Sequence, residues 1–127
     1  MAFAFAIDQN IAEDGSVIKA AWTGGAAGDT GAGLQFIPWA DASVQVKGTI
    51  SGSTVTIEGS NDSTNGVDGN WDTLDDAKGA ALSLTVLTSS LKQIVQRPRW
   101  IRCAVTGGTG SAIAVTLIMR RANPLRT

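Results

Sequence analysis

Apolar and polar residues alternate along much of this chain, which is the pattern of half-buried β-strands. Within residues 42–50, valine and isoleucine occupy alternate positions, and residues 54–58 repeat the pattern. The Ser-Gly-Ser link at 51–53 has the chemistry of a tight turn. Residues 42–59 therefore predict a hairpin of two antiparallel strands.

Further segments alternate in the same way. They are residues 3–7, 17–23, 82–86, 100–105 and 111–121. A glycine-rich turn at 106–110 joins the last two of them and predicts a second hairpin near the C-terminus. The Gly- and Ala-rich stretch 23–33 has no period and predicts a flexible loop. Residues 89–96 have apolar side chains at helical spacing and favour a short helical turn, which Arg97-Pro98 would end.

Several short strands separated by Gly-rich turns indicate an all-β fold. We expect a single-domain antiparallel β-sandwich, jelly-roll-like, with about eight short strands. The length of 127 residues fits one domain with one modest core. Residues 1–127 then form this domain, with residues 1–10 as an N-terminal strand or arm and residues 122–127 as a C-terminal tail.

The composition of the chain narrows the classes of function that it could have. Hydrophobic residues make up 43% and charged residues only 17%, so we expect a partner to cover part of the surface. No apolar run reaches the roughly 20 residues that cross a bilayer, and the first residues carry no basic region before their apolar ones. We therefore expect an unprocessed, non-secreted chain with no membrane partner.

The chain has no histidine and a single cysteine. A Ser-His-Asp or Cys-His arrangement is therefore impossible, as are zinc sites built on imidazole. Cys103 lies on the apolar parity of its strand, which predicts a small buried hydrophobic residue and not a nucleophile. We expect a protein that is not an enzyme, with no catalytic residue, no metal site and no cofactor.

Opposite charges lie in opposite halves of the chain. All 11 acidic residues lie at or before Asp76, whereas eight of the 10 basic residues follow it. The arginines are Arg97, Arg99, Arg102, Arg120, Arg121 and Arg126. Strands from the two halves could pair so that these charges meet internally. Alternatively, they could form a bipolar surface that docks neighbouring copies or an acidic partner.

An oxygen-rich segment at 62–76 is a candidate ligand loop. Its candidate residues are Asp62, Asp68, Asn70, Trp71 and Asp72. Such loops can hold calcium, but Thr73 and Gly79 stand where an EF-hand needs its glycine and glutamate. A solvated acidic turn is the alternative.

Aromatic residues raise two further alternatives. The four tryptophans could form a sugar-stacking face, although tryptophans in small sandwiches more often belong to the core or an interface. Trp100 and the arginines could bind a nucleic acid. A pI near 5.2 and the lack of tyrosine argue against this, so we expect no nucleic-acid partner.

Two parts of the chain resemble phage proteins. Residues 55–62 (VTIEGSND), followed by residues 70–74 (NWDTL), resemble a hairpin of many phage virion proteins and of discoidin-like β-sandwich domains, with extra residues at about 66–69. Residues 94–105 and the closing strand ending in Arg120-Arg121 look like small tailed-bacteriophage head proteins, in particular capsid decoration (cement) proteins. The resemblance covers about residues 42–121.

This resemblance implies a jelly-roll or related sandwich on the outer surface of a phage head, made in the host cytoplasm. It implies a homotrimer that clamps subunits of the major capsid protein. The partner-binding residues would be Phe3, Phe5, Ile7, Arg97, Arg99, Arg102, Arg120, Arg121 and Arg126.

Several alternatives remain open. The arginines would pair with capsid carboxylates, and the segment 3–7 would add as a strand to a neighbour or form an edge strand of its own sandwich. Residues 122–127 would reach onto a partner or form a disordered end. A carbohydrate-binding discoidin-like module, or a neck or tail component of the virion, is the alternative function.

Overall fold

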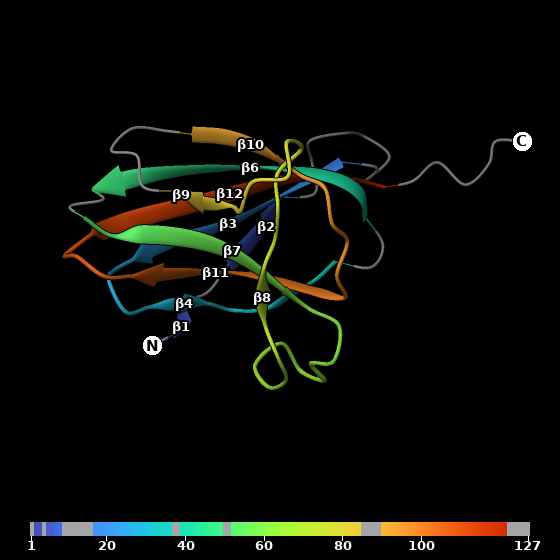
Figure 1. The fold of residues 1–127 in the computed structure, drawn as a ribbon, viewed down its shortest axis with the longest axis horizontal. Coiled ribbons are helices and arrows are strands. Elements are labelled where there is room, and N and C mark those ends of the chain that lie inside the picture. The colour runs from blue at the N-terminus through green and yellow to red at the C-terminus, as the bar shows by residue number, and fades with distance from the viewer. Residues whose placement is uncertain are drawn as a thin grey trace, which may run out of the picture.

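The computed structural model describes residues 2–3, 5–8, 17–36, 39–49, 52–84 and 90–121. All regular structure in these residues is β, with no helix (Figure 1). The strands are β1 (Ala2–Phe3), β2 (Phe5–Asp8), β3 (Val17–Gly25), β4 (Thr30–Gly31), β5 (Leu34–Gln35), β6 (Trp39–Thr49), β7 (Thr54–Ser60), β8 (Asp72–Thr73), β9 (Ser83–Leu84), β10 (Ser90–Ile94), β11 (Trp100–Thr106) and β12 (Ser111–Arg121). The expected all-β fold is confirmed.

The strands form two facing sheets with jelly-roll order. One sheet runs β10-β6-β12-β3-β2, and the other runs β1-β4-β11-β7-β8, with β9 also paired to β7 and β5 to β11. Eight of these strands, in the orders β3-β12-β6-β10 and β4-β11-β7-β9, cross repeatedly between the sheets as a jelly roll does. Only β1 and β4 pair in parallel among the described strands.

The core lies between the sheets and comes from alternate residues of each strand. Trp22, Val44 and Leu117 project inward from the five-stranded sheet, and Ile57 and Cys103 project inward from the other. Each is at most 1% exposed. Burying a large apolar side chain contributes about 1.5–3 kcal/mol, so this interface holds the sheets together.

The predicted hairpin at 42–59 is wrong, although both of its strands exist. β6 pairs with β10 and β12, whereas β7 pairs with β11, β8 and β9 in the opposite sheet. The link between them is therefore an arch from one sheet to the other. Alternation fixes which face of a strand is buried, but it does not determine which strand is the neighbour. An arch and a hairpin leave the same pattern in the sequence.

The second predicted hairpin is wrong for the same reason. β11 belongs to the seven-stranded sheet and β12 to the five-stranded one, so the turn at 107–110 also crosses between sheets. Gly107 and Gly108 adopt φ values of 69° and 59°, which suit glycine in a tight crossing. β12 then starts with a bulge at Ala112, whose φ is 53°.

The stretch 23–33 is ordered, which corrects the prediction of a flexible loop. β3 extends through Gly25, and the following turn is held by hydrogen bonds from the Ala26 N–H to the Asp29 carboxylate at 3.0 Å and from the Gly28 N–H to the Val105 carbonyl at 2.9 Å. Glycine is needed at Gly31, because a Cβ there would lie 2.7 Å from the Cys103 sulfur. Small residues therefore mark close packing in this stretch.

Residues 90–94 of the predicted helical turn at 89–96 form a strand, and residue 89 lies outside the described residues. β10 pairs antiparallel with residues 42–46 of β6 and forms one edge of its sheet. Ile94 is buried, but Leu91 and Val95 are 68% and 47% exposed, so the three residues do not share a buried face. A segment this short gains little from helical hydrogen bonds, whereas an open sheet edge offers a full set.

Candidate functional site

The candidate ligand loop is held together by its own carboxylates. Asp68 accepts hydrogen bonds from the Ser63 hydroxyl at 2.9 Å, the Thr64 N–H at 2.7 Å and the Thr64 hydroxyl at 2.6 Å. These hydrogen bonds, from Thr64 first, lower the pKa of Asp68 to about 2. This carboxylate acts as the internal acceptor of a structured turn.

Asp62 plays the same part at the start of the loop. It accepts hydrogen bonds from the Asn70 backbone N–H and side-chain amide, both at 2.8 Å, and from the Ser60 hydroxyl at 2.9 Å. The bonds from Asn70 are the main cause of its lowered pKa. Asp62 and Asn70 thus join the two ends of the loop.

The indole N–H and the ring face of Trp71 both contact other residues of the chain. Its indole N–H donates to the Asp68 carbonyl at 2.9 Å, and the Arg102 guanidinium lies 4.0 Å from its ring centroid. Arg102 also forms an ion pair with Glu58 at 2.9 Å, directly across from it on β7. At this position, a basic residue of the C-terminal half of the chain pairs with an acidic residue of the N-terminal half. The other tryptophans, Trp22, Trp39 and Trp100, are at most 8% exposed, so the four tryptophans do not form the sugar-stacking face that was one alternative.

The described residues contain no group of three or more acidic, cysteine or histidine side chains placed to hold a metal ion. They also contain no helix able to span a membrane. Cys103 is fully buried, as expected, and burial raises the pKa of its thiol to about 12. The thiolate needed for nucleophilic chemistry is therefore suppressed.

Three of the candidate arginines gather around the first residues of β6. Arg97 donates from Nε to the Ala40 carbonyl, and the Arg121 guanidinium lies 5.2 Å from the Trp39 ring centroid. Arg120 lies across from Asp41 in the register of β12 and β6. All three arginines and Asp41 are exposed, so positive charge exceeds negative charge at this end of the sandwich. We call it the basic end.

The other predicted partner-binding residues lie elsewhere. Arg99 is exposed two residues after Arg97, and its backbone N–H donates to the Asn61 side chain at 2.9 Å. Arg126 and the whole segment 122–127 lie outside the described residues.

The N-terminal apolar residues lie in edge strands. β1, which contains Phe3, pairs with β4, and β2 pairs with β3 at the edge of the five-stranded sheet. Phe5 packs edge-on against Trp22 with ring centroids 5.8 Å apart, whereas Ile7 is 38% exposed. These residues therefore lie in edge strands of the chain's own sandwich. Addition of the segment 3–7 as a strand to a neighbour stays a prediction.

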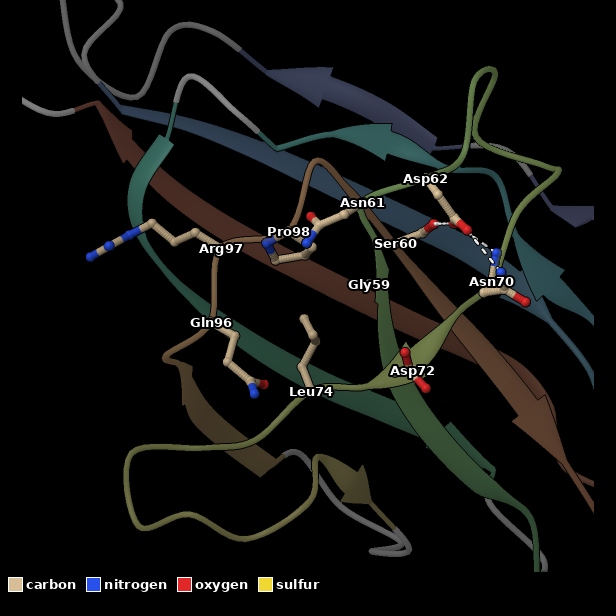
Figure 2. A pocket seen from close by; sticks show the side chains of 10 residues that line it. All are labelled: Gly59, Ser60, Asn61, Asp62, Asn70, Asp72, Leu74, Gln96, Arg97 and Pro98. Atoms are coloured by element: carbon tan, nitrogen blue, oxygen red, sulfur yellow. Dashed lines mark hydrogen bonds between the residues drawn. The ribbon is translucent and has the colours of Figure 1, made fainter.

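A cleft of about 540 Å³ opens at the end of β7 (Figure 2). Segments far apart in the sequence line it. Its lining residues are Gly59, Ser60, Asn61, Asp62, Asn70, Asp72, Leu74, Gln96, Arg97 and Pro98. In Figure 2, Leu74 extends toward Pro98 in the middle of the cleft, and the Arg97 guanidinium extends away from the other lining residues.

The cleft brings together only part of the predicted ligand loop. Asp62, Asn70 and Asp72 line it, while Asp68 and Trp71 do not. Sequence reasoning missed Leu74, Gln96 and Pro98. Their local sequence carries no motif that predicts a binding site. They line the cleft because strand pairing brings distant segments together.

No family model and no curated protein matches the chain. Among solved structures, it is similar to the SPBc2 prophage-derived protein YomS, with a TM-score of 0.60 and 12% identity over 81% of this chain and 93% of that chain. The fold is therefore shared with a prophage-derived protein.

More distant similarities also exist. One is to a Bacillus endospore appendage protein, with a TM-score of 0.44 and 14% identity over 95% of this chain and 91% of that one. Another is to a family 11 carbohydrate-binding module of Clostridium thermocellum, with a TM-score of 0.34 and 11% identity over 93% of this chain and 82% of that one. Both TM-scores are too low to support a functional argument.

Proposed function

We propose that this chain is a virion structural protein of a tailed bacteriophage, a decoration protein that binds the major capsid protein on the outer surface of the head. The observation that carries the proposal is the jelly-roll fold shared with the prophage-derived protein YomS. The decoration role itself comes from the sequence resemblance at residues 42–121. The lack of histidine fits adhesion better than catalysis.

The contact surface in this proposal is the β10 edge together with the basic end. An edge strand presents backbone N–H and C=O groups that another chain can pair with. On β10, Leu91 is 68% exposed, and Val95 follows at 47%. A shallow groove of about 310 Å³, lined in part by Gln93, Ile118 and Arg120, lies beside this strand.

Charge complements this apolar edge. Arg97 and Arg120 flank it, and arginine forms bidentate pairs with carboxylates at interfaces. The partner would therefore offer an extended segment with apolar side chains and nearby carboxylates. Buried apolar anchors with a charged rim are typical of specific protein interfaces. Contacts repeated around a homotrimer would clamp neighbouring capsid subunits.

The test is sedimentation of the full chain with heads that lack it, prepared from the phage that encodes it, after light scattering has given its mass in solution. We expect a trimer that cosediments and saturates at a fixed ratio to the major capsid protein. Leu91→Glu should abolish cosedimentation. Val67→Glu is the matched control, because Val67 is 75% exposed on the separate 61–71 loop. A chain that stays in the supernatant would contradict the proposal.

A further inference from the structure

We propose that the cleft at the end of β7 binds a neutral hexopyranose, either free or at the end of a glycan chain. This inference does not rest on the proposed function, because it concerns a separate surface and is tested on the chain alone.

The floor of the cleft is apolar. Leu74 is 6% exposed, and it extends toward buried Pro98 beside Gly59 (Figure 2). A Cβ at Gly59 would lie 2.8 Å from both the Leu74 Cδ2 atom and the Pro98 Cβ atom, so the glycine leaves room for both side chains. The resulting surface suits the C–H face of a sugar ring.

The walls carry side-chain amides that are already oriented. The Asn61 Oδ1 atom accepts from the Arg99 N–H at 2.9 Å, and the Gln96 Oε1 atom accepts from the Asp75 N–H at 2.6 Å. Both amides therefore keep their NH₂ groups available as donors. Asn70 is held in the opposite sense, because its NH₂ donates to Asp62 and leaves its oxygen as an acceptor.

Asp72 adds an acceptor that the fold does not use. Its side chain is exposed, and it makes no hydrogen bond or ion pair with another described residue. The donors of Asn61 and Gln96 thus lie on one side of an apolar floor, and the acceptors of Asn70 and Asp72 lie on the other (Figure 2). A sugar hydroxyl both donates and accepts, so this arrangement matches a polyol ring better than an anion or an apolar ligand.

The cleft fits a small ligand with preformed contacts. Its volume lies within the usual range for ligand sites, and amides fixed by backbone groups lose little freedom on binding. A calcium ion suits it less well. Asp62 and Asp72 are its only carboxylates among the described residues, and Asp62 already accepts three hydrogen bonds.

The test is an NMR titration of the nitrogen-15-labelled full chain with glucose, galactose and N-acetylglucosamine. At least one sugar should shift the side-chain amides of Asn61, Asn70 and Gln96 and the backbone amide of Gly59. The dissociation constant should be on the order of 1 mM, as expected for a ligand of this size. Asp72→Ala should weaken binding by about tenfold or more.

Thr73→Ala is the matched control, since Thr73 is exposed on the same short strand but does not line the cleft. It should bind like the wild type. The inference would be overturned by the absence of these shifts with all three sugars, or by equal shifts with glycerol. Calcium chloride shifting these amides when no sugar does would also overturn it.

Discussion

Ser53 and Gly107 join the two arches that connect the sheets. The Ser53 hydroxyl donates to the Gly107 carbonyl at 2.7 Å, and it accepts from the Gly110 N–H at 2.8 Å. Ser53 is fully buried, so one side chain satisfies backbone groups of a turn 54 residues away. The β6–β7 and β11–β12 links, which the sequence pattern predicts as hairpins, are crossings between the sheets, and this serine lets them stabilise each other.

Replacing this serine should destabilise the sandwich. Ser53→Ala should lower the free energy of unfolding by about 1–3 kcal/mol, because backbone groups of the second arch lose their buried partner. Urea unfolding measures the change. Ser111→Ala is the control, since Ser111 is exposed beside the same arch. Equal unfolding midpoints for the two variants would show that the buried hydroxyl does not matter.

Substitutions at Gly66 and Gly79 should distinguish the cost of a steric clash from the cost of backbone strain. Both adopt positive φ, at 84° and 82°, but a Cβ would lie 2.9 Å from the Trp100 ring at Gly66 and meets nothing within 4 Å at Gly79. Gly79→Ala should cost about 1–2 kcal/mol from strain alone. Gly66→Ala should cost more, because the loop must also lift from Trp100. Thermal unfolding of both variants checks the order, and the reverse order would contradict the packing.

Arg102 links Glu58 to Trp71, and its removal should loosen the loop. Arg102→Ala should lower the free energy of unfolding by about 1 kcal/mol, because the variant loses a partly buried ion pair and a cation–π contact. It should also increase acrylamide quenching, which reports Trp71 because the other three tryptophans are buried. Arg99→Ala should change neither quantity. Unchanged quenching in Arg102→Ala would mean that the guanidinium does not cover the ring.

The 61–71 loop should keep its folded structure in acid until the pH falls to about 2. Since the pKa of Asp68 lies near 2 in the folded chain and its ordinary value is 3.8, the folded state holds this proton less tightly. Its stabilisation is complete above pH 3.8 and is lost as the pH falls through about 2. NMR of the Asp68 carboxyl and the Trp71 indole should follow this transition. Asp72→Asn should leave it unchanged, and titration of Asp68 near 3.8 would contradict the hydrogen bonds.

Much of the fold could be predicted from alternation alone. The alternation predicted two strands and their buried faces correctly at the described residues 42–49 and 54–58, and Cys103 was correctly placed in the core. Strand pairing could not be derived in this way. A tight link at 51–53 joins neighbouring strands in one sheet or crosses to another with the same local sequence, and only contacts such as that of Ser53 decide between them.

The candidate site was only partly predictable. The loop residues Asp62, Asn70 and Asp72 stood out because oxygen-bearing side chains cluster there in the sequence. Gln96 and Pro98 join them because the link from β10 to β11 passes beside β7, which no local pattern encodes. The internal use of Arg102 likewise depends on its register opposite Glu58.

We propose that this chain decorates a phage head through its β10 edge and basic end. Cryo-electron microscopy of heads lacking the protein, incubated with the full chain, tests it most directly. We expect added density at the junctions between capsid subunits, with Leu91 and Arg120 facing the capsid. Heads with no added density would contradict the function, and density that places the 61–71 loop against the capsid would contradict the contact surface.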